Sequence, residues 1–320
     1  MSYEPRRVPW QEDIRIRGLR HRLTWWGERT STPIVLLHGF LDSGATWQFL
    51  VDRLPPPWTL VAPDWRGFGD SEWAPGGYWF PDYFADLELL LDTVVPRSRA
   101  RIIGHSMGAN VAKMYGGIRP HRLQWLVNLE GLGLARTRAD EAPQRYARWL
   151  DELRQPVREG RYASVEQLAS ILRTRNPRLT ADAAGFIAKA WSRPVGSDSR
   201  EADSPQGGPR NGAVSVAAGE RTGPEVQLRF DPRHRLVNPI LYRREEAEVC
   251  WAKLEIPMLL VTGELSEHRA RLTHEQLHAL FRQLRIVTIP GAGHMMHHED
   301  PQSVARHIVE FERDSVSAAP

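Results

Sequence analysis

Short runs of apolar residues alternate along the chain with longer segments in which apolar residues recur at helical spacing. The runs at 34–37, 59–62, 99–103 and 123–129 have the length of buried strands. The segment 82–95 places apolar residues every three or four positions, as expected of a helix with one buried face. Strands that alternate with helices of this length favour a mainly parallel sheet with helices on both faces.

The same alternation returns near the C-terminus, where the pattern predicts strands at 257–262 and 285–289 followed by a closing helix. The intervening stretch, roughly 135–250, contains helical patterns and shows no convincing strand. We therefore expect an α/β core formed by residues 1–134 and 251–320, interrupted by a helical cap.

Part of the predicted cap, 195–224, has a composition of its own. It is rich in Gly, Ser, Pro and acidic residues and has few large apolar side chains. Such a segment buries too little apolar surface to order itself, so we expect a mobile loop there. A helical insertion between two core strands suits a lid over a site, although an insertion that contacts no site would leave the same pattern.

The bulk composition is that of an ordinary globular protein, with 41% hydrophobic and 25% charged residues in 320. The apolar runs are too short to span a bilayer, and the N-terminal residues lack the apolar block of a secretory signal. Cys250 is the single cysteine, which rules out an internal disulfide and fits a reducing compartment. We expect a soluble cytoplasmic protein without membrane association.

The charge pattern argues against a nucleic-acid partner. The chain carries 42 basic and 39 acidic residues for a net charge of +3. Arginine is spread along the chain and interleaved with acids, so no basic stripe forms. We expect a small-molecule partner and no nucleic acid, while the oligomeric state is left open.

The strongest chemical signal is the pentapeptide Gly104–Gly108, GHSMG, which follows a predicted strand and precedes a predicted helix. This is the context of a G-x-S-x-G nucleophile elbow. A very tight turn holds the serine in a strained backbone conformation and pushes its hydroxyl out at the carboxyl end of the sheet. Ser106 is therefore the candidate nucleophile, and the helix that starts at Met107 offers N–H groups to a developing oxyanion.

An upstream loop, His38-Gly39-Phe40, follows the strand predicted at 34–37. Acyl transfer needs two N–H donors aimed at the tetrahedral oxygen, one from the residue after the nucleophile and one from such an earlier loop. This predicts Met107 and Phe40 as the donors of the oxyanion hole. His38 could itself act as a base, but we favour a packing role in the turn.

The candidate general base is His294, which follows Gly291–Gly293 directly after the last predicted strand. A glycine-flanked loop at this point can bring the ring back over the sheet edge to the serine, in the order Ser, acid, His. His297, His298 and Glu299 are residue types that ligate metals. We favour packing and loop-stabilising roles for them, since no other ligand set points there, and we expect neither a metal nor a cofactor.

Together these signals resemble the α/β-hydrolase superfamily, over the whole chain except the insertion. The segment 64–71, DWRGFGDS, also resembles the D-x-R-G-x-G-x-S loop of that superfamily, which is mainly structural. Within it the likeness is to bacterial esterases and lactonases with a G-H-S-M-G elbow and a helical cap. The resemblance implies the α/β-hydrolase fold, with a mostly parallel eight-stranded sheet, and a carboxylic ester or lactone as substrate.

The position of the triad acid departs from the superfamily pattern. Most members carry an aspartate in a G-x-x-D sequence before the final helix–strand pair, whereas the segment Gly263–Ser266 here ends in serine. An acid must then come from elsewhere. Glu264 and Glu267 stand near the usual place but out of register, and they remain alternatives.

Glu130 is the favoured acid, because it follows the strand at 123–129. A right-handed crossover from the nucleophile strand places this strand beside it, and neighbouring strands are about 4.8 Å apart. Some haloalkane dehalogenases of the superfamily use an acid after the same strand. We predict that Glu130 fixes the tautomer of His294 and stabilises its imidazolium.

For the substrate pocket, Trp47, Trp65 and Trp191 are candidate walls, although a tryptophan more often belongs to a core. The favoured function is cleavage of an ester or lactone through an acyl-enzyme. The same residues would also serve a C–C bond hydrolase or a perhydrolase of the cofactor-free haloperoxidase kind. A non-catalytic ligand-binding receptor with this fold is a further alternative, which the intact Ser106 and His294 framework disfavours.

Overall fold

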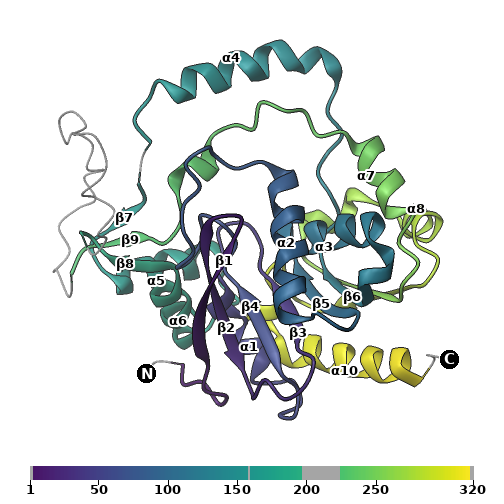
Figure 1. Cartoon of the computed structure of the whole chain (residues 1–320). Coiled ribbons are helices and arrows are strands. Elements are labelled where there is room, and N and C mark those ends of the chain that lie inside the picture. Colours follow the sequence, from purple (N-terminus) through teal and green to yellow (C-terminus); the bar gives the residue numbers. More distant parts are fainter. Residues whose placement is uncertain (1–2, 158, 197–223, 318–320) are drawn as a thin grey trace. The chain divides into compact units, whose positions relative to one another are not determined.

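The computed structural model describes residues 3–157, 159–196 and 224–317 (Figure 1). The chain divides into two compact units. The smaller unit is Met1–Tyr3 with Arg158–Arg229, and the larger unit is Glu4–Val157 with Phe230–Pro320.

An eight-stranded sheet forms the centre of the larger unit, in the order β1-β2-β4-β3-β5-β6-β10-β11. β2 pairs antiparallel with β1 and with β4, and the other neighbours pair in parallel. The mostly parallel eight-stranded sheet predicted from the sequence is thus confirmed. Its strands are β1 (Trp10–Ile16), β2 (Leu19–Trp26), β3 (Ile34–Leu37), β4 (Leu60–Pro63), β5 (Ala100–His105), β6 (Leu123–Leu129), β10 (Met258–Gly263) and β11 (Leu284–Ile289).

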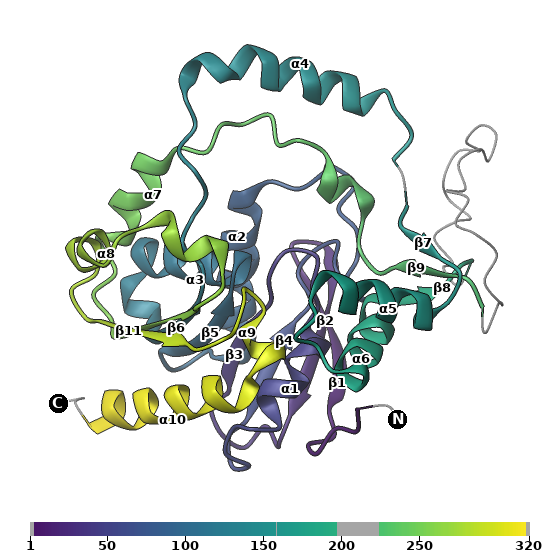
Figure 2. The ribbon, with the colours of Figure 1, turned by 180° about the vertical axis from the view of Figure 1, so that it is seen from behind.

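Helices cover both faces of this sheet, which is why its central strands are continuous apolar runs. β3, β4 and β10 are buried at every position. On one face, α1 (Gln48–Val51) and α10 (Pro301–Ser317) lie side by side over core residues such as Val127 and Val261. On the opposite face lie α2 (Phe80–Val94) and α3 (Met107–Ile118), as the two opposed views show (Figures 1 and 2).

The remaining helices of the larger unit connect or extend these layers. The helix predicted at the start of the insertion forms as α4, and a short α9 separates β11 from α10 (Figure 2). Among the described residues, no helix combines the length and apolar character needed to cross a bilayer. The bounds are α4 (Ala142–Leu153), α7 (Arg244–Trp251), α8 (His274–Leu280) and α9 (Met296–Glu299).

The smaller unit contains two helices and a three-stranded antiparallel sheet in the order β7-β9-β8. The expectation that residues 135–250 hold no strand is wrong, because these strands span two or three residues, too few to show an alternating pattern. Most of the predicted mobile range, 197–223, lies outside the described residues. The elements are α5 (Val165–Arg175), α6 (Ala181–Trp191), β7 (Arg161–Tyr162), β8 (Ser192–Pro194) and β9 (Val226–Leu228).

The loop at 64–71 is held by buried polar contacts, in keeping with a structural role. The Asp64 carboxylate accepts hydrogen bonds from two backbone N–H groups, at 2.6 and 2.8 Å. The Arg66 guanidinium donates two hydrogen bonds of 2.5 Å to the Asp86 carboxylate on α2. Because both partners are buried, each charge depends on the other for its compensation.

Asp86→Asn should therefore lower the free energy of unfolding by about 3 kcal/mol, since it leaves the Arg66 charge buried without its main counterion. Chemical denaturation followed by circular dichroism measures the change. The matched control is Asp140→Asn, which removes an exposed partner of Arg138 and should cost less than about 1 kcal/mol. Equal effects of the two substitutions would contradict the structural role of the buried pair.

Candidate active site

The nucleophile elbow lies between the end of β5 and the start of α3. Ser106 has φ 49° and ψ −110°, a conformation that costs a non-glycine residue about 1–3 kcal/mol. A Cβ at Gly104 would lie 2.7 Å from the Ala109 backbone, and a Cβ at Gly108 would lie 2.2 Å from the Leu37 carbonyl oxygen. Only glycine permits this close approach, so the turn has the tight geometry that the pentapeptide predicts.

The loop after β3 packs directly on the elbow. A Cβ at Gly39 would lie 2.7 Å from the His105 ring and 3.2 Å from Ser106 Cβ. Phe40 is the next residue of that loop, and Met107 is the first residue of α3, where backbone N–H groups lack intrahelical acceptors. The two predicted oxyanion donors thus belong to segments adjoining Ser106, and the aim of their N–H groups at one oxygen stays a prediction.

His38 stabilises this loop through its hydrogen bonds. Its Nε2 accepts a hydrogen bond from the Trp65 backbone N–H at 3.0 Å, and its carbonyl accepts one from the Trp65 indole N–H at 3.1 Å. Its Nδ1 donates to the Gly39 carbonyl at 2.8 Å. Complete burial lowers the pKa of His38 to about 4, so the ring is neutral and serves packing, as we favoured from the sequence.

The structure places His294 against Glu130. His294 follows the loop after β11, and its Nδ1 lies 2.7 Å from Glu130 Oε2. The imidazole is 26% exposed, whereas the carboxylate is fully buried. Because a carboxylate accepts, Nδ1 carries the proton and donates it, which leaves Nε2 as the nitrogen able to take a proton from a nucleophile.

Two further donors fix the Glu130 carboxylate. The Ser266 hydroxyl donates to Oε2 at 2.6 Å, and the Gly263 N–H donates to Oε1 at 2.7 Å. Ser266 occupies the position where most α/β hydrolases carry the acid itself. The sequence showed that the usual aspartate is missing here, but the part of this serine in orienting a displaced acid was not predicted. The signal that could have predicted this role is a hydroxyl residue just after β10, the strand that pairs with β6.

Two other carboxylates near the site accept hydrogen bonds from backbone N–H groups instead. Glu264 Oε2 accepts from the Gly291 N–H at 2.8 Å, and Glu299 Oε2 accepts from the Gly293 N–H at 2.6 Å. Both contacts brace the loop that carries His294. Glu267 begins a short 3-10 helix, Glu267–Arg271. Glu130 is accordingly the carboxylate that the structure sets on the His294 ring.

Histidine contacts bring the candidate base to the elbow from 189 residues away. His105 Nε2 donates to the His294 carbonyl at 3.0 Å, so the base is anchored to the residue next to Ser106. Burial lowers the pKa of His105 well below its usual range, which keeps its ring neutral. His268 stands edge-on to His294 with 4.3 Å between ring centroids. The hydrogen bond between Ser106 and His294 itself stays a prediction.

The three tryptophans predicted as pocket walls have different surroundings. Trp47 is 1% exposed, belongs to the hydrophobic core and packs against His297 with 5.0 Å between ring centroids. Trp65 is equally buried and supports His38. Trp191 ends α6 in the smaller unit. Packing explains the first two, and a role in a pocket stays a prediction for all three.

One group of metal-ligand types lies beside the site. His297 and His298 of α9 are buried and face Asp42, which lies in the loop that carries Phe40, and the three ligand atoms lie within 4.8 Å of one another. The sequence grouped the two histidines with Glu299, but the Glu299 carboxylate accepts from the Gly293 backbone N–H, and Asp42 is the carboxylate that faces the two rings.

Comparisons with known proteins identify the family of this chain. Residues 32–301 match the family model of the α/β hydrolase fold. A 2-(acetamidomethylene)succinate hydrolase from Mesorhizobium japonicum is 26% identical, with 89% of each chain covered. A serine hydrolase-like protein from Danio rerio is 31% identical over 59% of this chain, which spans 57% of that protein's length.

Solved structures extend the likeness to almost the whole chain. The hypothetical protein PA1622 from Pseudomonas aeruginosa PAO1 superposes with a TM-score of 0.76 at 26% identity, covering 95% of this chain and 99% of its own. A thioesterase domain from the curacin biosynthetic pathway has the same TM-score and coverage at 22% identity. With a family match over most of its length and a nucleophile elbow in the expected place, the chain belongs to the α/β-hydrolase fold family.

Proposed function

We propose that this protein is a serine hydrolase that cleaves a carboxylic ester or lactone through an acyl-enzyme. The observation that carries the proposal is the 2.7 Å contact between His294 Nδ1 and Glu130 Oε2, in a fold that also presents Ser106 on a strained elbow. A histidine whose Nδ1 is held by a buried carboxylate is set up to work as a base through Nε2.

In the acylation step, Ser106 Oγ attacks the substrate carbonyl carbon while His294 Nε2 takes the hydroxyl proton. The carbonyl oxygen becomes an oxyanion, which the N–H groups of Phe40 and Met107 bind. Collapse of this intermediate breaks the bond to the leaving alkoxide, to which His294 returns the proton. The imidazolium that forms in between is stabilised by Glu130.

In the deacylation step, water attacks the acyl carbonyl carbon while His294 takes a proton from the water, and the bond between that carbon and Ser106 Oγ then breaks. The tetrahedral oxygen returns to the same donors, and the acid is released as Ser106 regains its proton. Each proton taken is returned, so the cycle needs no cofactor. Loss of one oxyanion donor typically slows such chemistry by about a hundred- to a thousandfold.

A second candidate is hydrolysis of a bond other than an ester on the same residues. The observation behind it is the near full-length likeness to a 2-(acetamidomethylene)succinate hydrolase, at 26% identity. A substrate panel separates the two: p-nitrophenyl esters, lactones, the acetamidomethylene succinate and vinylogous diketones. The ester proposal expects its highest kcat/KM among the esters and lactones. Turnover confined to the other two classes would favour the second candidate.

Ser106→Ala should lower kcat by about a millionfold, because it removes the nucleophile while leaving the fold intact. Turnover of a p-nitrophenyl ester and labelling by a fluorophosphonate probe are the measurements. Ser170→Ala, on the exposed side of α5, is the matched control and should keep both. Wild-type turnover by the Ser106 variant would refute the assigned nucleophile.

Glu130→Gln should lower kcat by about ten-thousandfold, because a side-chain amide no longer stabilises the imidazolium. Ester turnover at saturating substrate measures it, with thermal melting to show that the fold is retained. Glu264→Gln is the matched control, since its carboxylate accepts a hydrogen bond from the Gly291 backbone, and we expect less than a tenfold loss. A larger loss of kcat for Glu264→Gln than for Glu130→Gln would assign the role of the acid to Glu264.

A carboxylate at position 266 should be able to take over the role of the Glu130 carboxylate. In a Glu130→Asn background, Ser266→Asp supplies a carboxylate where the hydroxyl now lies 2.6 Å from Glu130 Oε2, within reach of the same ring nitrogen. We expect kcat to recover by about tenfold or more over Glu130→Asn alone. Ser266→Asn in the same background is the uncharged control and should restore nothing. Equal kcat for the two double variants would argue against the proposed geometry.

A further inference from the structure

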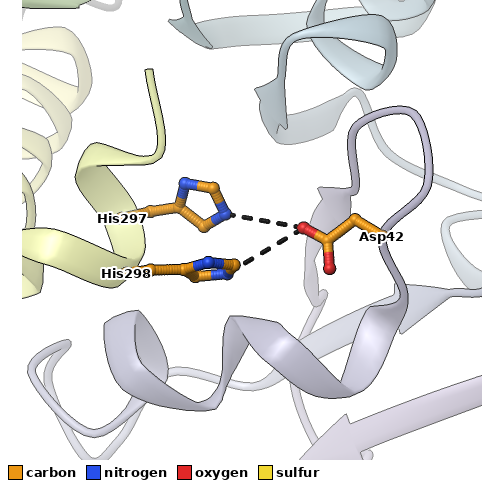
Figure 3. Close-up of side chains that lie close together, drawn as sticks. All are labelled: Asp42, His297 and His298. Carbon is orange, nitrogen blue, oxygen red and sulfur yellow. Dashed lines mark ion pairs between the residues drawn. The ribbon is translucent and has the colours of Figure 1, made fainter. Parts of the chain in front are cut away.

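Three buried side chains converge beside the catalytic loops. Asp42 lies in the loop that carries Phe40, and His297 and His298 lie on α9 directly after His294. Their side chains are 2%, 1% and 1% exposed. His297 Nε2 is 3.8 Å and His298 Nε2 is 3.9 Å from the same oxygen, Asp42 Oδ2 (Figure 3).

These separations are close to those of ligands that share an ion. An N–H···O hydrogen bond has its nitrogen and oxygen about 2.7–3.2 Å apart, so 3.8 and 3.9 Å are too long. Zinc binds imidazole nitrogen and carboxylate oxygen at about 2.0–2.2 Å, so two ligands of one tetrahedral ion lie about 3.5 Å apart. The three ligand atoms lie within 4.8 Å of one another, so an ion would draw them together by at most about 1.3 Å.

Burial and charge favour a cation at this point. Asp42 Oδ1 accepts hydrogen bonds from the Ser43 N–H at 2.8 Å and the Thr46 hydroxyl at 2.6 Å, which orients Oδ2 toward the rings. Burial disfavours protonation of imidazole, so both rings offer neutral nitrogen atoms, the form that binds metal. Among the described residues, His298 Nε2 has no hydrogen-bond partner although it is buried.

We propose that Asp42, His297 and His298 form a structural site for a divalent transition metal ion, with Zn²⁺ the best match to two imidazoles and one carboxylate. The ion would tie the loop of Phe40, a predicted oxyanion donor, to the helix that follows His294. Ser43 and Thr46 act as the outer partners that orient the carboxylate ligand. The proposal concerns binding and stability, and it stands independently of the reaction that the enzyme catalyses.

The first test uses the wild-type protein after treatment with a chelator and buffer exchange. Titration with Co²⁺ should give about one equivalent of a visible absorption spectrum with the intense bands of a low-coordinate site, and Zn²⁺ should displace it. Saturating Zn²⁺ should raise the melting temperature by about 4 °C or more. The absence of stoichiometric binding, or only the weak bands of a hydrated surface complex, would overturn the proposal.

Variants then assign the ion to these residues. Asp42→Asn and His298→Gln should each remove the Co²⁺ spectrum and the thermal shift by Zn²⁺, while circular dichroism reports on the fold. His278→Gln is the matched control, because His278 is an exposed histidine of α8, and it should bind like the wild type. Retention of the spectrum in either folded variant would place the ion elsewhere and overturn the assignment. The wild-type spectrum decides the question even where a variant does not fold.

Discussion

The hydrogen bond between His294 Nδ1 and Glu130 Oε2 is the interaction on which the proposed chemistry depends, and strand order makes it possible. β6, β10 and β11 are consecutive neighbours in the sheet, and they pair in parallel. Their carboxyl ends therefore meet at one edge, where β6 delivers Glu130, β10 delivers Ser266 and β11 delivers His294. The three contacts that hold the carboxylate come from two segments, residues 263–266 and the loop of His294, and both lie more than 130 residues from Glu130 along the chain. A change in strand order would therefore separate Glu130 from His294.

Two of the four non-glycine residues with positive φ in the described part of the chain lie where the proposed reacting groups leave the sheet. Ser106 and Glu130 both have positive φ, 49° and 54°, at the ends of the adjacent strands β5 and β6. The strand ladder sustains these turns, since Ser106 N–H donates to the Leu129 carbonyl at 2.8 Å. Lys113, buried in α3, donates to the Gly131 carbonyl at 2.6 Å. The helix that begins at the nucleophile thus also fixes the turn of the acid, which couples the positions of the two groups.

Features encoded locally were predictable from the sequence, and contacts between distant loops were not. The alternation of apolar runs predicted the sheet and its helices, and the glycine spacing around Ser106 predicted a turn that only glycine allows. The crossover length placed Glu130 beside the elbow. No sequence pattern predicts that Asp42 faces His297, because Asp42 lies after the third strand of the chain and His297 lies after the last strand. The strands of the smaller unit escaped notice because two or three residues carry no alternation.

The displaced acid has a physical consequence for the proposed reaction. Glu130 is fully buried, and its hydrogen bonds to Ser266 and Gly263 are donated by neutral groups, which only partly offset the cost of a buried charge. In the proposed reaction, His294 takes the nucleophile's proton and gains a positive charge. The attraction between the two side chains is therefore much stronger in the transition state than in the resting enzyme, and low surrounding polarity strengthens it further. An interaction that grows in this way lowers the barrier instead of merely tightening substrate binding, so in the proposed reaction burial of the acid would contribute directly to the rate.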